Sequence, residues 1–272
     1  MKKIKIIAEI GINHNGSVEL AKKIIAVSAA AGCDYVKFQK RNPDVCVPED
    51  QKLKVRSTPW GEMTYIDYKK KIEFEKEQYD EIDKFCKQLG IKWFASAWDL
   101  SSLDFLKRYS DVVKIPSALI TNEELLLNAR KKFDFLLIST GMSTESEVEN
   151  AVKISNPDVI FHTNSSYPSK VEDLNLNYIK HLKNKFNRTV GYSGHEFGLV
   201  TTFATVPLGV EWIERHVTLD REMWGSDQKS SVEPSGIYKL VKGIRDIEKS
   251  LGSIGPRVIC KEELEKKKSL RG

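Results

Sequence analysis

Long apolar runs are missing from this sequence of 272 residues. None approaches the roughly 20 consecutive apolar residues that cross a bilayer as a helix. Near the amino terminus lysines precede a short apolar stretch, but Glu9 interrupts it before the core of a signal peptide can form. We therefore expect a soluble, cytoplasmic protein with no membrane partner.

Closely spaced cysteines and a strong charge imbalance are also lacking. The cysteines are scattered, at Cys33, Cys46, Cys86 and Cys260, which argues against a zinc knuckle and against a secreted disulfide framework. With 43 basic and 38 acidic residues the net charge is only +5. This modest excess suits an anionic small substrate and gives no indication of nucleic acid as a partner.

Short β-branched runs alternate with longer amphipathic segments along the whole chain, a pattern typical of βα units around a parallel sheet. Ser17 and Thr144 precede two of the amphipathic segments and are the expected N-caps of helices. The predicted strands are Ile4–Ile10, Tyr35–Phe38, Ile91–Ser96, Val112–Ile115, Phe135–Ser139, Val159–Thr163, Thr189–Tyr192 and Glu211–Val217. Eight such strands predict the α/β class and a single-domain (β/α)8 TIM barrel.

The barrel is expected to occupy residues 1–251. Residues 252–272 read as a C-terminal tail with a Gly-Pro pair and a Lys/Glu-rich stretch, too short for another domain. One connection, from about Lys40 to Tyr65, is long and rich in proline. Long connections in compact domains are often functional, so we expect this one to lie over the barrel mouth.

Polar side chains stand at the end of nearly every predicted strand, where barrel enzymes carry their active sites. Period-two alternation places Lys37 and Gln39 on one face of their strand, and Glu214 and His216 on one face of the last strand. Charged groups on an inward face are costly unless they are used. The strand ends therefore predict an active site inside the barrel mouth.

Two interpretations of Lys37 and Lys114 stay open. The two lysines are solvated or salt-bridged, or their ammonium groups clamp a ligand that carries both a phosphate and a carboxylate. Lysine is uncommon inside strands, which favours the second interpretation. Hydroxyl groups that would add hydrogen bonds follow other strands, at Ser96, Ser117, Ser139 and Ser193.

His195 and His216 end the last two predicted strands, and neighbouring strands run about 5 Å apart. One metal ion could join both imidazoles, or each histidine could be satisfied separately. Two protein ligands would leave most coordination positions open. An open site of this kind suits a Lewis acid that polarises an aldehyde oxygen.

Taken together, these segments resemble the N-acetylneuraminate (sialic acid) synthase family, including the legionaminate and pseudaminate synthases. The resemblance covers essentially the whole barrel, in the family's order. The segments that carry it are Ile7 to Gly16, Val36 to Gln39, Lys114 to Ser117, Ser139 to Met142, Ser193 to His195 and Glu214 to Arg221.

The resemblance implies a transferase that condenses phosphoenolpyruvate with an open-chain aldose, with C–O cleavage of phosphoenolpyruvate, to give a sialic-acid-like 2-keto-3-deoxy sugar acid and phosphate. It implies catalytic roles for Glu9, His195 and His216, with Mn2+, or else Mg2+ or Co2+, on the two histidines. Phosphoenolpyruvate would be held by Lys37, Lys114, Ser96, Ser117, Ser139, Ser165 and Ser193. The sugar would meet Gln39, Tyr167 and Asp227. A homodimer is the expected assembly.

Two departures from the family's pattern bear on the second substrate. Leu119 stands where the family commonly has an acidic residue near the water and the phosphate, so Glu214 or Asp227 would have to cover that role. The family's small antifreeze-like domain, which lies over the partner subunit's site, is not expected within residues 252–272. The aldose is therefore N-acetylmannosamine-like, or a different or unacylated sugar, or the lid comes from a separate polypeptide.

Two other functions fit some of the same residues. A Schiff-base aldolase would use Lys37 or Lys114 as its nucleophile and need no metal. A non-catalytic sensor of phosphoenolpyruvate or of a sugar acid would agree with Leu119 and the absent lid. The presence of Glu9, His195 and His216 together argues against the sensor, because a binder has no need of all three.

Overall fold

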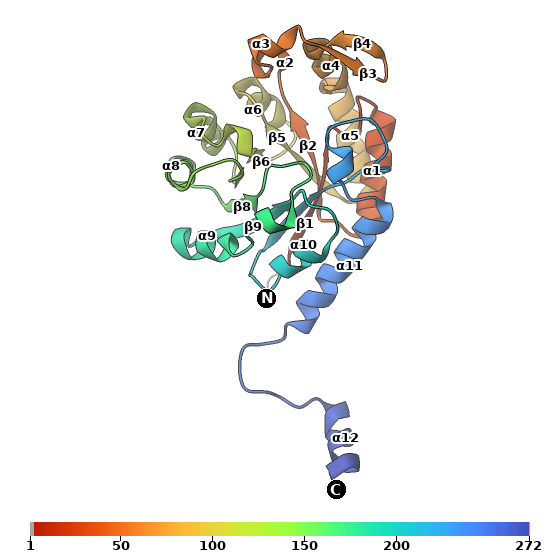
Figure 1. Ribbon diagram of the computed structural model, residues 1–272, viewed down its shortest axis with the longest axis vertical. Coiled ribbons are helices and arrows are strands. Elements are labelled where there is room, and N and C mark those ends of the chain that lie inside the picture. The colour runs from red at the N-terminus through yellow and green to blue at the C-terminus, as the bar shows by residue number, and fades with distance from the viewer. Residues whose placement is uncertain (1–2, 272) are drawn as a thin grey trace.

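Eight parallel strands close into a barrel in the computed structural model, which describes residues 3–271 (Figure 1). Around the barrel the order is β1-β10-β9-β8-β7-β6-β5-β2, and closure is complete because β1 pairs with both β2 and β10. The strands are β1 Lys5–Gly11, β2 Tyr35–Lys40, β5 Lys92–Ala97, β6 Val112–Ile115, β7 Phe135–Ser139, β8 Val159–Thr163, β9 Thr189–Gly194 and β10 Trp212–His216. Each predicted strand is found within two residues of its predicted bounds, which confirms the TIM barrel.

Helices follow the strands and cover the outside of the barrel. Two predicted N-caps are confirmed: Ser17 accepts a hydrogen bond from the backbone of Leu20, and Thr144 forms a capping box with Glu147. The helices are α1 Val18–Ala31, α5 Lys76–Leu89, α6 Leu100–Leu106, α7 Glu123–Lys132, α8 Glu145–Ser155, α9 Tyr178–Phe186, α10 Val200–Thr205 and α11 Pro234–Ser250. Short 3-10 helices lie at Ser117–Leu119, Val171–Asp173 and Gln228–Ser230.

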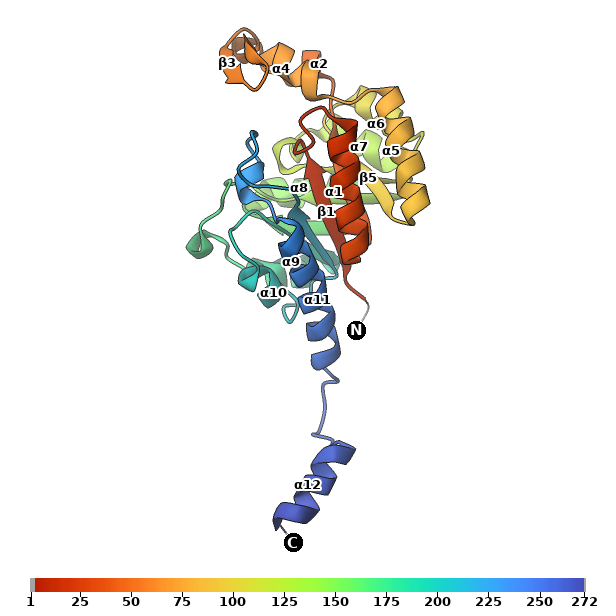
Figure 2. The same cartoon turned by 90° about the vertical axis from the view of Figure 1, so that its right-hand side faces the viewer.

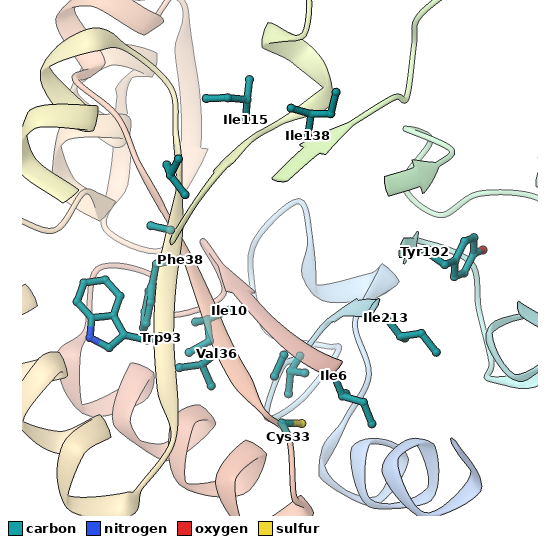
Figure 3. Packing of buried hydrophobic residues seen from close by; sticks show 14 of the residues in the cluster. Ile6, Ile10, Cys33, Val36, Phe38, Trp93, Ile115, Ile138, Tyr192 and Ile213 are labelled. Atoms are coloured by element: carbon teal, nitrogen blue, oxygen red, sulfur yellow. The ribbon is translucent and has the colours of Figure 1, made fainter. Parts of the chain in front are cut away.

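Alternation along the strands divides the apolar side chains between two layers. Outward residues such as Ile6, Val36 and Ile213 pack between the strands and the helices (Figure 3). Inward residues, among them Phe94 and Phe161, form a separate buried cluster inside the barrel. Because that cluster is apolar, the inward polar residues are left to the strand ends at the mouth.

The long connection between β2 and β5 is not a loop over the mouth, as the sequence predicted, but a small structured unit at its edge (Figure 2). It holds α2 Pro43–Cys46, α3 Glu49–Lys52, the antiparallel hairpin of β3 Val55–Thr58 and β4 Gly61–Thr64, and α4 Tyr65–Ile72. We call residues 41–72 the rim segment. Trp60 and Tyr68 contact Trp224, in the loop after β10, with ring centroids 6.1 and 5.2 Å apart. This aromatic contact holds the segment beside the mouth.

Beyond α11 the chain leaves the barrel. Residues 251–260 run as an extended segment, and α12 Lys261–Arg271 stands apart from the barrel with every residue exposed (Figures 1 and 2). The predicted barrel range, 1–251, begins with residues 1 and 2, and the predicted tail range, 252–272, ends with residue 272. These three residues lie outside the described part of the chain. In the described part of the chain, no helix combines the length and the apolar character needed to span a membrane.

Candidate active site

The predicted site residues converge on one cavity at the carboxyl ends of the strands. Its volume is about 210 Å³. Asp227 lies just outside, with its Oδ2 atom 3.9 Å from Nδ1 of His216. The predicted residues that line the cavity are Glu9, Lys37, Gln39, Ser96, Lys114, Ser117, Ser139, Ser165, Tyr167, Ser193, His195 and His216.

Four buried charges form what we call the floor of the cavity: Glu9, Lys37, Lys114 and Glu214. The Lys37 ammonium lies 2.6 Å from Oε2 of Glu9 and 3.8 Å from Oε1 of Glu214. The Lys114 ammonium lies 2.8 Å from the same Glu214 oxygen. Both lysines are therefore salt-bridged, as one interpretation of the sequence held, but inside a cavity where a ligand can reach them.

Hydroxyl groups surround this floor. Lys37 donates to Oγ of Ser96 at 2.9 Å, and Ser193 donates to Glu214 at 3.0 Å. On the β7 side, the backbone N–H of Gly141 donates to Oγ of Ser117 at 3.0 Å. A Cβ atom at Gly141 would lie 2.1 Å from Oγ of Ser165, so only glycine leaves these hydroxyls room. The strand ends thus supply a ring of small donors around the two ammonium groups.

The two floor carboxyls differ in proton affinity. Burial raises the pKa of Glu9, and the nearby Glu214 charge adds to this against the opposing effect of Lys37. Burial also acts to raise the pKa of Glu214, but Lys114 and Lys37 outweigh it and hold that pKa at about 2. Carboxyls whose environments push their pKa values apart can take different proton-transfer roles. Glu214 is a fixed acceptor, and Glu9 is the carboxyl that holds a proton more readily.

His195 and His216 lie side by side, with ring centroids 5.5 Å apart. Nδ1 of His195 donates to the backbone carbonyl of Asn164 at 2.6 Å, and Tyr167 stacks on the ring at 4.1 Å. Burial lowers the pKa of His195 to about 3, so the ring is neutral. A backbone carbonyl that fixes one ring nitrogen and leaves the other free is the usual support of a metal-binding histidine.

The pair fits a metal ion as two of its ligands. The Nδ1 atom of His216 is buried and has no hydrogen-bond partner within residues 3–271. Three or more His, Cys, Asp or Glu residues grouped for metal binding are not found in the described part of the chain. The other coordination positions would therefore belong to water or substrate, as in open catalytic sites.

Five lining residues were not among the predicted site residues: Trp98, Pro116, Ala118, Met142 and Thr163. Trp98 follows Ser96 by two residues, and Thr163 ends β8 in step with the inward Phe161, so period-two alternation could have found both. Met142 ends one of the segments that carry the family resemblance, and it has a positive φ of 60° just after Gly141. Polarity alone guided the prediction, which is why two large apolar side chains were missed.

Leu119 does not face the cavity. It packs against the hydrophobic core, while Pro116, Ser117 and Ala118 line the wall. Among the described residues, the carboxylates that line the cavity are Glu9 and Glu214. Of the two residues suggested to replace an acidic group at position 119, Glu214 is therefore the one in contact with the cavity.

Comparison with known proteins gives one consistent result. A model described as the NeuB family matches residues 24–255. The N-acetylneuraminate-9-phosphate synthase of Drosophila melanogaster is 38% identical, over 96% of this chain and 74% of that protein. The N,N'-diacetyllegionaminic acid synthase of Campylobacter jejuni is 35% identical, over 93% of this chain and 78% of that protein. The structure of an N-acetylneuraminic acid synthetase from Leptospira borgpetersenii, in complex with citrate, superposes with a TM-score of 0.87 at 33% identity, covering 99% of this chain and 93% of that one.

Proposed function

Because the chain belongs to the NeuB family and is a phosphoenolpyruvate-dependent sugar-acid synthase, we propose that it condenses phosphoenolpyruvate with an open-chain, N-acetylmannosamine-like aldose in a metal-dependent reaction. The products are a sialic-acid-like 2-keto-3-deoxy sugar acid and phosphate. The observation that carries the proposal is a single cavity with two buried ammonium groups, a ring of serine hydroxyls and two adjacent histidines. The cytoplasmic location and the homodimer stay predictions.

Phosphoenolpyruvate would bind at the floor. An ammonium group has three donors. Lys37 uses two of them on Glu9 and Ser96, and Lys114 uses one on Glu214, so both retain donors for an anionic ligand. Charge-assisted hydrogen bonds of this kind are roughly twice as strong as neutral ones. The remaining oxygens of the ligand would be met by the hydroxyls of Ser117, Ser139, Ser165 and Ser193.

His195 and His216 would hold Mn2+, with Mg2+ or Co2+ as alternatives. When bound, such an ion supplies Lewis-acid polarisation of the aldehyde oxygen. Tyr167 stacks on His195 and meets the edge of the His216 ring, so it is placed to orient the sugar beside both rings. Gln39 donates to Glu9 at 3.2 Å and would order that carboxyl against the sugar hydroxyls.

In the reaction, the enol carbon of phosphoenolpyruvate bonds to the aldehyde carbon, water adds to the neighbouring carbon, and the C–O bond to phosphate breaks. Glu9 would pass a proton to the former aldehyde oxygen, since burial raises its pKa and makes it the floor carboxyl that takes up a proton more readily. The Oε2 atom of Glu214 is buried without a hydrogen-bond partner in residues 3–271, so it can accept from the attacking water. That water releases two protons as the new carbonyl forms: one leaves with the phosphate, and the other replaces the proton that Glu9 passes to the former aldehyde oxygen.

One observation favours a second candidate, the Schiff-base aldolase. Burial, together with the nearby charge of Lys37, lowers the pKa of Lys114 to about 8 against the opposing effect of Glu214. A lysine with a lowered pKa is a better nucleophile. The hydrogen bond from Lys114 to Glu214 opposes this role, because it holds the group as an ammonium ion.

Phosphate release tests the proposal. Metal-loaded protein is given phosphoenolpyruvate with 18O in the bridging oxygen and a panel of aldoses, and each product is assayed as a 2-keto-3-deoxy acid. We expect the label in the released phosphate, and no turnover after chelation until Mn2+ is restored. Full activity without metal, with a borohydride-trapped pyruvate adduct on Lys114, would instead establish the aldolase. Silence across the panel from folded, metal-loaded protein would favour the sensor.

A further inference from the structure

Arg215 and Glu196 form a buried ion pair on the outer side of the barrel, where neither side chain lines the cavity. Arg215 precedes His216 on β10, and Glu196 follows His195 just after β9. Alternation along β10 turns Arg215 away from the cavity that His216 lines. Arg215 is 1% exposed and Glu196 is completely buried. The pair therefore joins the two strands at the residues next to the two histidines.

The guanidinium group of Arg215 binds the backbone that follows His195. Its Nη2 atom donates to the carbonyl of Glu196 at 2.6 Å, and its Nη1 atom donates to the carbonyl of Gly198 at 2.9 Å. Nη1 also lies 3.2 Å from Oε1 of Glu196. In the strand pairing Arg215 stands opposite Gly194, the residue before His195. The strand ladder thus fixes the backbone before His195, and the Arg215 side chain fixes the backbone after it.

The Glu196 carboxylate is held from several sides. In addition to Arg215 it accepts hydrogen bonds at 2.8 to 2.9 Å from the hydroxyls of Tyr192, Thr201 and Thr202. Burial acts to raise the pKa of Glu196, but Arg215 and the hydrogen bonds outweigh it and lower that pKa, so the pair is ionic. A Cβ atom at Gly194 would lie 2.6 Å from Oε2 of Glu196. The carboxylate therefore packs directly on β9, in the space that this glycine leaves.

A buried ion pair is weak evidence for stability, because the cost of removing two charges from water can exceed their attraction. A planar guanidinium does hold its acceptors in a fixed geometry. The histidine rings need such support. Nδ1 of His195 donates to the carbonyl of Asn164, but Nδ1 of His216 has no hydrogen-bond partner within residues 3–271. The placement of the two rings relative to each other therefore depends on the backbone that carries them, and Arg215 ties those two pieces of backbone together.

We propose that Arg215 and Glu196 are positioning residues that hold the rings of His195 and His216 side by side for one metal ion. This inference rests on the proposed function, in which the two histidines bind a divalent ion. Groups that orient metal ligands from outside contribute about 10- to 100-fold to metal affinity. Loss of the pair should therefore weaken metal binding and leave the phosphoenolpyruvate site at the floor unchanged.

Mn2+ binding measures this effect without any substrate. The whole chain, stripped of metal, is titrated with Mn2+, and the electron paramagnetic resonance signal of the free ion gives the Kd; the binding that His216→Ala abolishes defines the site. Arg215→Met should raise this Kd by at least about ten-fold. At saturating Mn2+ the KM for phosphoenolpyruvate should not change. Arg215→Lys keeps the charge but lacks the planar fork, so we expect an intermediate Kd.

A double variant separates positioning from stability. Arg215→Met alone leaves Glu196 as an unpaired buried charge, which is far more costly than removing both charges. Arg215→Met combined with Glu196→Gln should therefore regain stability in chemical denaturation and still bind Mn2+ as weakly as Arg215→Met. If Arg215→Met does not fold, as judged by circular dichroism, the double variant replaces it.

Arg245→Met is the matched control. Arg245 also binds a carboxylate and a backbone carbonyl, those of Asp34 at 3.1 Å and Ile4 at 2.8 Å. These two residues directly precede β2 and β1, at the end of the barrel opposite the histidines. The control should lower the free energy of unfolding and leave the Kd for Mn2+ unchanged.

An unchanged Kd in folded Arg215→Met would overturn the inference. An equal loss of affinity in Arg245→Met, or a double variant that regains affinity together with stability, would do the same, since the pair would then act on the fold alone. Mn2+ binding that does not depend on His216 would also overturn it, even if phosphate is released from phosphoenolpyruvate with an aldose, which would leave the condensation itself intact. Mn2+ binding that depends on Arg215, in a protein that releases no phosphate, would sustain the inference and reject the proposed function.

Discussion

The floor of the cavity and the rim segment both carry buried lysines. At the floor each lysine is paired with a carboxylate, whereas Lys69 of the rim segment has no ion pair within residues 3–271. At the floor two lysines meet two carboxylates, and the shortest N to O distances are 2.6 and 2.8 Å. At the rim the Lys69 ammonium lies over the rings of Tyr65 and Tyr68, and Glu73 is shared by Lys40 and Arg41. The charges at the floor are paired with one another, whereas the Lys69 ammonium makes no ion pair within residues 3–271.

The origin of the two regions explains this difference. Barrel pairing places Glu9 beside Lys37 and beside His216, and Ser96 beside Lys114, so closure of the sheet alone assembles the floor. The cations of the rim segment lie elsewhere: Arg41 directly follows β2, Arg56 lies in the β3–β4 hairpin and Lys69 lies in α4. In barrel enzymes the strand ends carry the chemistry and the loops vary with the substrate. We therefore expect the reaction to depend on the floor and the choice of aldose to depend on the rim segment.

The largest expected effect comes from removing a histidine beside the floor. His216→Ala should lower kcat by about 1000-fold, because Lewis-acid polarisation contributes several kcal/mol to stabilising the transition state. The fold should persist, since the ring lines a cavity. Phosphate release and circular dichroism measure the two effects. His181→Ala, at an exposed histidine of α9 paired with Glu145, is the control and should keep full activity. Undiminished turnover in His216→Ala would show that the histidines beside the floor do not contribute to the reaction.

A second substitution tests whether the floor is balanced. Lys114→Met should lower the free energy of unfolding by about 3 kcal/mol, since removing one partner of a buried pair leaves an uncompensated charge. Adding Glu214→Gln should restore at least half of that loss without restoring activity. Chemical denaturation of both variants measures this. If Lys114→Met unfolds no more easily than the wild type, the pairs at the floor are not holding each other in place.

Sequence was sufficient for the barrel and for the polar lining of its mouth. Strand alternation has a fixed period, so the inward position of Lys37 follows from its strand, and closure of the barrel then leaves only β1 between Lys37 on β2 and Glu214 on β10. The pairing partners themselves did not follow, because the inward charges come from four strands, β1, β2, β6 and β10, and could have met in several combinations. Leu119 was expected near the ligand, yet it lies on the first turn after β6 with its side chain half-buried against the core.

The rim segment could not be predicted in the same way. Its prolines and glycine suggested a loop, but a hairpin and a short helix form there because Trp60 and Tyr68 pack on Trp224, more than 150 residues away in sequence. Contacts at that separation leave no periodic signal in either segment. The isolated charge of Lys69 depends on this packing, so it appears only in the folded chain.

The smallest expected effect is that of Lys69→Met on the free energy of unfolding, and its sign is opposite to that expected for Lys114→Met. Without ligand, Lys69→Met should raise the free energy of unfolding by about 1 kcal/mol at pH 7, because methionine fills a similar volume without a desolvated charge.

The pKa of Lys69 is lowered to about 8 in the folded state, mainly by burial and by Arg41, against about 10.4 in an unfolded chain. The charged form is therefore penalised by folding below pH 8, and wild-type stability should gain on the variant as pH rises from 8 towards 10.4. Denaturation at pH 7 and pH 9.5, with Lys70→Met as the control, measures both effects. A loss of stability in Lys69→Met at pH 7, or a difference independent of pH, would mean that the rim is balanced in the same way as the floor.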